Sequence, residues 1–264
     1  MVGTSGNKPG YKVFSINTTI RNPKRNAEFL EVLQNFDNTD LTKEVKIKIY
    51  IELIRRGIYQ VSNLDSITKE KYEDSVLLED KEIYTVMANN PQKTGNDGRL
   101  MTQIRALKDT GFVNLIGNGR NKLLQITPLG KDLLNNKNIE DIYSKAMIGM
   151  HSNNPQRTTI FNEARPFLNT LFAINKINEY YNNNKGILWH EFAFFILPMK
   201  DCNYEKAVKK IIEYRSIYKN KINQEYLENY IYNEIGVNRI KFKRILKDYA
   251  DDVYRKFNMT GLIY

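Results

Sequence analysis

Apolar residues recur at three- and four-residue steps through most of this chain, the spacing that gathers them on one face of an α-helix. In the first half of the chain the pattern predicts helices over residues 23–36, 41–56, 80–89 and 98–109. In the second half it predicts helices over residues 166–181, 187–197, 204–218 and 225–234, and a last helix that Asn238 caps and that runs through Phe257. The sequence therefore predicts a mainly helical protein.

Short extended segments interrupt the helical pattern. Residues 11–20 are rich in aromatic and β-branched types, and residues 112–116 and 122–127 flank the turn Gly117-Asn118-Gly119-Arg120-Asn121. Thr127-Pro128 then suits the start of another helix, because threonine caps well and proline fits the first turn. The order of helix, hairpin and helix predicts a complete winged helix over residues 80–134.

One phrase of this hairpin occurs twice. Thr110-Gly111-Phe112-Val113-Asn114 follows a predicted helix and leads into a strand, and Thr260-Gly261-Leu262-Ile263-Tyr264 repeats its small residue, glycine and apolar run. We expect the second copy to begin a strand whose hairpin partner is missing from these 264 residues.

The predicted fold class is mainly α with short β-hairpins (α+β), in tandem winged-helix or helix-turn-helix subdomains. Residues 1–134 would form an N-terminal winged-helix subdomain, residues 135–223 a helical linker with a helix-turn-helix-like pair, and residues 224–264 an incomplete winged helix. The pair at 187–197 and 204–218 has the spacing of a helix-turn-helix, but any helical hairpin shares that spacing.

Composition excludes several classes of protein. No apolar run approaches the roughly 20 residues that a membrane span needs, and no signal-peptide stretch opens the chain. We therefore expect a cytoplasmic protein without a membrane partner. The single cysteine, Cys202, excludes an internal disulfide, and the wide separation of His151 and His190 argues against a metal site built on Cys or His.

Charge points to a polyanionic partner. Forty Lys and Arg against thirty Asp and Glu give a net charge of +10 and a pI near 9.4. Nucleic acid is the obvious candidate. Net charge alone is weak evidence, since Lys206, Lys209 and Lys210 fit the solvated face of a predicted helix.

The predicted winged helix supplies most candidate DNA contacts. In helix 98–109, Leu100, Ile104 and Leu107 form a core stripe. Thr102 and Arg105 point away from this stripe, and Arg99 and Gln103 lie on its shoulders; these are residue types that reach bases and phosphates. Other candidates lie in the preceding loop, at the wing tip, in an N-terminal basic cluster and in a polar loop between subdomains. The full set is Arg21, Lys24, Arg25, Lys93, Arg99, Thr102, Gln103, Arg105, Arg120, Asn121, Gln156 and Arg157. Each of them also fits an ordinary solvated surface position.

No catalytic or metal-binding residue is predicted. Glu44-Val45-Lys46, with Asp40 upstream, matches the acidic-x-Lys spacing of a nuclease strand, but its surroundings fit a helix that ends at Gly57. Trp189-His190-Glu191 fits helix packing better than a catalytic cluster.

The chain resembles the N-terminal half of AlwI-type restriction endonucleases and is similar in plan to the recognition part of FokI. The residues that carry the resemblance are Lys8–Val13, Thr19–Pro23, Arg105–Phe112, Ile126–Gly130, Asn162–Phe167 and Phe257–Leu262. Enzymes of this kind are type IIS restriction endonucleases or nicking relatives, which read a short asymmetric duplex sequence and cut beside it with a separate nuclease domain. The resemblance implies a monomeric reader of double-stranded DNA that is inactive alone. It implies no cofactor in this chain, with Mg²⁺ expected only for the nuclease domain.

Two other functions fit the same residues. A winged-helix transcription regulator or replication initiator would bind DNA without cutting it, and a protein-interaction module would use its wings on a partner subunit. The unfinished last wing and the lack of an evident dimerisation helix favour the endonuclease interpretation over a regulator.

Overall fold

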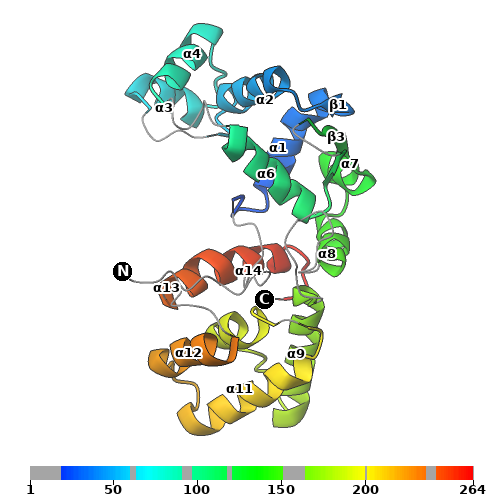
Figure 1. Ribbon diagram of the computed structural model, residues 1–264, viewed down its shortest axis with the longest axis vertical. Helices are drawn as coiled ribbons and strands as arrows, with labels where there is room; N and C mark the ends of the chain where they lie inside the picture. Colours follow the sequence, from blue (N-terminus) through cyan, green and yellow to red (C-terminus); the bar gives the residue numbers. More distant parts are fainter. Residues whose placement is uncertain are drawn as a thin grey trace, which may run out of the picture. The chain divides into compact units, whose positions relative to one another are not determined.

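The computed structural model describes residues 19–59, 64–90, 97–117, 121–150, 164–199, 201–235 and 242–263 (Figure 1). Contacts divide the chain into two compact units. We call residues 22–142 the hairpin unit, and residues 143–263 with Thr19–Arg21 the helical unit. The division into three subdomains stays a prediction.

The helices of the hairpin unit confirm the helical periodicity of the first half of the chain. Its described helices are α1 (Arg25–Leu33), a 3₁₀ turn (Gln34–Phe36), α2 (Lys43–Arg55), α3 (Ser66–Glu73), α4 (Asp80–Ala88), α6 (Asp97–Asp109) and α7 (Pro128–Leu134). Helix α8 (Ile139–Gly149) continues into the helical unit. Thr127 caps α7 as predicted, because its Oγ1 accepts a hydrogen bond from the Gly130 N–H at 3.0 Å.

A small antiparallel sheet joins distant parts of this unit. Strands β2 (Val113–Ile116) and β3 (Leu123–Ile126) form the predicted hairpin, with Val113 opposite Ile126. A third strand, β1 (Thr39–Asp40), pairs with the other edge of β3 and gives the order β1-β3-β2. Strand β1 was not predicted, since two residues are too few for a period-2 pattern.

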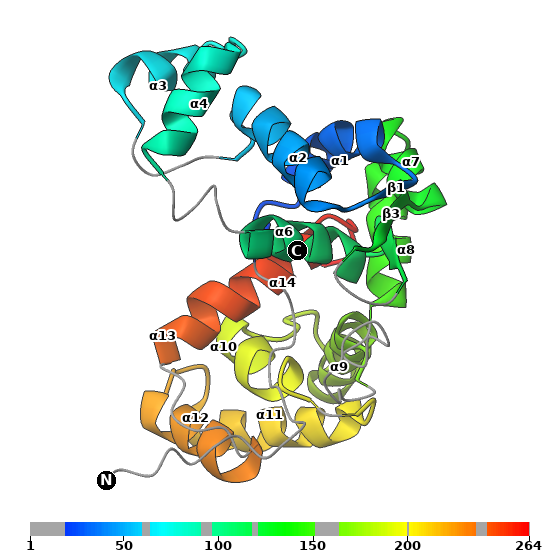
Figure 2. The same cartoon turned by 45° about the horizontal axis from the view of Figure 1, so that its top comes forward.

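The core of the hairpin unit lies where α1, α2, α6 and α7 meet beside the sheet (Figure 2). Leu30, Ile49, Leu53, Leu107 and Phe112 are among its fully buried side chains. Helices α1 and α2 precede the α3–α4 segment in the sequence, and α6 and α7 follow it. The core therefore includes residues from α1 onward. Within residues 80–134, α6 and α7 therefore pack against the earlier helices α2 and α1, and the winged helix expected there stays a prediction.

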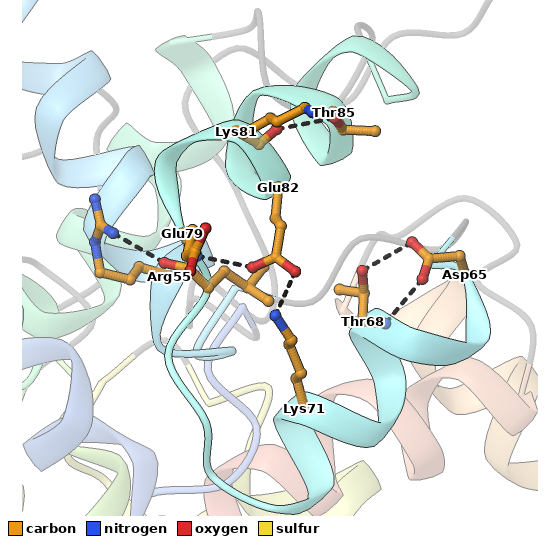
Figure 3. Close-up of polar contacts among 9 residues, drawn as sticks. Arg55, Asp65, Thr68, Lys71, Glu79, Lys81, Glu82 and Thr85 are labelled. Atoms are coloured by element: carbon orange, nitrogen blue, oxygen red, sulfur yellow. Dashed lines mark hydrogen bonds and ion pairs between the residues drawn. The ribbon is translucent and has the colours of Figure 1, made fainter.

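Polar contacts attach α3 and α4 to each other and to α2 (Figure 3). Lys71 of α3 pairs with Glu82 of α4, and this contact holds the pKa of the Glu82 carboxyl below its usual range. Arg55 at the end of α2 reaches Asp80 at 2.6 Å. Asp65 caps α3 by accepting from the Thr68 N–H at 2.8 Å. Caps and ion pairs thus supplement the buried side chains of Leu78, Ile83 and Val86 in this segment.

The repeated threonine-glycine phrase ends a helix in both places. Gly111 and Gly261 have φ of +80° and +67°, a region that glycine adopts without strain. Thr110 and Thr260 each bond back to a carbonyl of the preceding turn. After Gly111 the chain enters β2, but after the turn at Thr260 and Gly261 neither Leu262 nor Ile263 is in a strand, so the prediction of a strand there is wrong for these residues. Tyr264 lies outside the described residues.

The helical unit confirms the periodicity of the second half of the chain. Its further helices are α9 (Pro166–Tyr181), α10 (Trp189–Glu191), α11 (Tyr204–Tyr218), α12 (Gln224–Tyr230), α13 (Phe242–Arg244) and α14 (Asp251–Asn258). Three π-helical segments continue α10, α12 and α13: Phe192–Ile196, Ile231–Ile235 and Ile245–Ala250. The described residues of this unit contain no strand. The predicted cap Asn238 and nearly all of segment 11–20 lie outside the described residues.

Aromatic rings dominate the core of the helical unit. Phe167, Phe194, Phe195, Tyr214 and Phe257 are almost completely buried. Phe167 and Phe257 meet edge to face with centroids 5.0 Å apart, which ties α9 to α14. Mainly helical content with one small sheet confirms the α+β class. No described helix is long and apolar enough to cross a membrane.

Candidate nucleic-acid interface

Helix α6 has the two faces that the sequence predicts. Leu100, Ile104 and Leu107 are buried, and they anchor the helix in the core of the hairpin unit. Thr102 and Arg105 are exposed. The Arg105 guanidinium makes no hydrogen bond or ion pair within the described part of the chain. A free guanidinium on a rigid helix is suited to a guanine edge or a phosphate.

Gln103 differs from the other candidates on α6. The structure leaves only 9% of it exposed, and its side-chain Oε1 has no hydrogen-bond partner among the described residues. The predicted position on the shoulder of the apolar stripe is therefore a covered one. A base contact by Gln103 stays a prediction that needs the side chain to become accessible. The side chain of Arg99 lies outside the described residues.

The hairpin after α6 carries one described candidate. Asn121 lies between β2 and β3, and its side chain is exposed. Gly117, directly after β2, has φ +101°, a backbone conformation that favours glycine. Arg120, and likewise Lys93 in the loop before α6, lie outside the described residues.

The N-terminal basic cluster is divided between the two units. Arg21 belongs to the helical unit, where it forms an ion pair with Asp248 at 2.7 Å. Arg25 donates to the Ile58 carbonyl and to Glu28, so it stabilises the hairpin unit. Lys24 is exposed, and among the described residues its ammonium has no partner. Of the three, only Lys24 is exposed and has no charged partner among the described residues. Gln156 and Arg157 lie outside the described residues.

The sequence assigned no candidate to the last helical stretch, but cations lie exposed there. Lys243, Arg244 and Lys247 are exposed between the start of α13 and the middle of the following π segment. Arg244 is partly neutralised by Asp248 at 3.8 Å. The four-residue spacing of Lys243 and Lys247 could have indicated a basic helix face in the sequence. The same spacing is common on solvated helix faces.

The nuclease-like spacing at Asp40, Glu44 and Lys46 does not form a catalytic strand. Glu44 and Lys46 both lie on α2, as predicted, and two residues apart on a helix they point to different sides. Glu44 is exposed whereas Lys46 is buried. Within the described residues no three His, Cys, Asp or Glu side chains are close enough to hold a metal ion. On a helix, this acidic-x-Lys spacing does not have the strand geometry of a nuclease site.

His190 and Glu191 are both buried in the helical unit, where the sequence predicts helix packing. Glu191 is fully buried and receives two bonds from Arg215, at 2.6 and 2.7 Å. His190 packs edge to face on Tyr214, and burial lowers the pKa of its imidazole. The Glu191 carboxylate is therefore held in an ion pair within the core, whereas the buried Nε2 of His190 has no hydrogen-bond partner among the described residues.

Comparison with known proteins agrees with the resemblance read from the residues. The family model described as AlwI restriction endonuclease matches residues 108–264, from the end of α6 through the helical unit. No curated protein matches the chain. Because the matched span covers more than half of the sequence, the chain belongs to the AlwI restriction endonuclease family.

Proposed function

We propose that these 264 residues are the DNA-recognition part of a type IIS restriction or nicking endonuclease, which binds a short asymmetric duplex site as a monomer. The observation that carries the proposal is Arg105, an exposed and unpaired guanidinium among the described residues, on α6 opposite the stripe that fixes this helix in the core. Family membership implies DNA as the partner. A free arginine on such a helix supplies the chemistry for a base contact.

The order of elements supports a winged-helix mode of binding. Helix α1, strand β1, helix α2, helix α6 and the β2–β3 hairpin follow one another, with α3 and α4 inserted before α6. In this arrangement α6 would enter the major groove and the hairpin would contact the neighbouring backbone or groove. Thr102 and Arg105 would then face bases or phosphates from α6, and Asn121 would do so from the hairpin. A FokI-like plan is part of this proposal.

Cleavage is assigned to a separate nuclease domain in this proposal. The acidic-x-Lys spacing at Glu44 and Lys46 lies on a helix, which argues against a nuclease strand at this position. The competing regulator or replication initiator would bind DNA equally well. Membership of a restriction endonuclease family favours recognition for cleavage.

Replacement of Arg105 by alanine tests the proposal. Binding sites are first selected from random duplexes, and affinity for the selected site is then measured by fluorescence anisotropy. We expect R105A to lose about 1–3 kcal/mol of binding free energy and to relax the preference at one base pair. Lys137→Ala is the control, because Lys137 is exposed on the same unit but already pairs with Asp132 at 2.6 Å.

Three results would contradict the proposal. Unchanged affinity and base preference in R105A would show that this face of α6 does not contact DNA. Selection of a palindromic site would contradict a monomeric reader of an asymmetric sequence. Cleavage of the selected duplex by this chain in the presence of Mg²⁺ would show that recognition and cleavage are not separated.

A further inference from the structure

A cavity of about 440 Å³ opens within the helical unit, between α9, the loop that follows it, α10 and α14. This volume lies in the range of about 300–1,000 Å³ typical of small-molecule sites. Aromatic side chains form much of the lining. Trp189 and Tyr254 meet edge to face with ring centroids 5.3 Å apart, and the buried ring of Phe257 lies at the same cavity.

Unused polar groups accompany these rings. The indole N–H of Trp189, the hydroxyl of Tyr254 and the amide of Asn184 make no hydrogen bond within the described part of the chain. The ammonium of Lys185 is exposed at the cavity and has no carboxylate partner among the described residues. The lining thus combines flat apolar surface, several donors and one positive charge.

Three hydrogen bonds fix the loop that carries Asn184 and Lys185. Asn178 Oδ1 accepts from the Gly186 N–H at 2.8 Å, and Asn183 Oδ1 accepts from the Lys185 N–H at 3.0 Å. Arg215 donates to the Gly186 carbonyl at 2.8 Å while it also bonds Glu191. A ligand at this cavity therefore meets a preformed edge and spends little free energy on ordering it.

We propose that this cavity binds one unstacked deoxynucleotide, with its base against the rings of Trp189 and Tyr254 and its phosphate at Lys185. Aromatic side chains bind bases of any sequence through their faces, and a lysine ammonium suits a phosphate. The net charge of +10 favours a phosphorylated ligand over a neutral aromatic one. The nucleotide has two possible sources: a free nucleoside monophosphate, or a nucleotide that has left the helix within a DNA strand.

Trp189 reports on this cavity directly, because it is the only tryptophan of the chain. Its fluorescence is measured while the full chain is titrated with the four deoxynucleoside 5′-monophosphates. Stacking of a base on the indole predicts saturable quenching. Deoxyribose 5-phosphate, which has the same phosphate but no base, should give no quenching.

Variants of the cavity separate this site from other anion sites. Lys185→Gln and Tyr254→Leu should each weaken monophosphate binding by about tenfold. Lys209→Gln is the matched control, since Lys209 is an exposed lysine of α11 that does not line the cavity. Lys185 is exposed, so its replacement tests the site without disturbing the fold. Equal binding by K185Q and the wild-type chain would overturn the proposal.

A second arm distinguishes the two sources. A duplex with one unpaired nucleotide is compared with the fully paired duplex and with the monophosphates. If the bulged duplex quenches the fluorescence at lower concentration than the paired duplex and the monophosphates, the ligand is an extrahelical nucleotide of DNA. If only the monophosphates quench it, the ligand is a free nucleotide. Absence of saturable quenching by every probe would overturn the proposal. R105A should keep its monophosphate response, so failure of this site and failure of duplex recognition by α6 are distinguishable.

Discussion

At the scale of single residues, one buried ion pair matters most for the helical unit. Arg215 and Glu191 bond through two atoms each and are almost fully buried, and Arg215 also holds the Gly186 carbonyl. Removal of one partner leaves an uncompensated charge in the core. We expect Arg215→Met to lower the free energy of unfolding by about 3–5 kcal/mol in chemical denaturation.

The exposed pair of Lys176 and Glu179 provides the control. Its atoms are just as close, at 2.7 Å, but both side chains are about half exposed. Lys176→Met should therefore leave stability nearly unchanged, because solvent screens such pairs. The double variant E191Q/R215M should recover part of the loss. If R215M were as stable as the wild-type chain, the pair would not hold the core together.

At the scale of elements, the junction between the hairpin and α7 leaves no room for a side chain. A Cβ at Gly130 would lie 2.3 Å from the Phe112 carbonyl oxygen, which belongs to the backbone and cannot rotate away. Gly130→Ala should therefore destabilise the chain by about 1–3 kcal/mol, although alanine is the better helix former.

Gly149 of α8 is the matched position for this prediction. A Cβ there meets no described atom within 4 Å, so Gly149→Ala should cause no loss of stability. Thermal unfolding of both variants compares the two helices. Equal midpoints for G130A and the wild-type chain would show that α7 can shift away from the hairpin.

The elements also differ in how far the sequence could predict them. The bounds of α9 and α11 followed from apolar spacing, and the start of α7 from its Thr-Pro pair, because these signals are local. Strand β1 was missed because its pairing with β3 depends on tertiary contact. The second Thr-Gly phrase was misread as the start of a strand. It specifies a helix end, and a strand forms after such an end only where a partner strand is available.

The candidate site was predicted in part for the same reason. The apolar stripe of α6 located Thr102 and Arg105 on an exposed face. Burial of Gln103 and the ion pair of Arg21 with Asp248 depend on neighbours that are distant in sequence. No local sequence pattern could predict the cavity beside Trp189, because its lining residues come from separated helices and a loop.

At the scale of the whole molecule, net charge overstates the number of cations free to meet phosphate. Arg21, Arg55 and Lys71 are engaged with carboxylates, whereas Lys24 and Arg105 are not, among the described residues. Log affinity for duplex DNA should fall with log salt at about −0.9 per phosphate contact. We expect a slope that corresponds to only a few phosphate contacts. Lys24→Gln should make the slope shallower by the amount of about one contact. An affinity independent of salt would contradict DNA recognition.

The pairing of β1 with β3 has a consequence for the order in which the hairpin unit folds. Thr39 meets Leu124, and α2, α3, α4, α6 and β2 all lie between them in the sequence. During synthesis, α1 and α2 leave the ribosome long before their sheet partner exists. Pairing of β1 with β3 is therefore a contact of high sequence separation, and we expect such a contact to slow the folding of this unit.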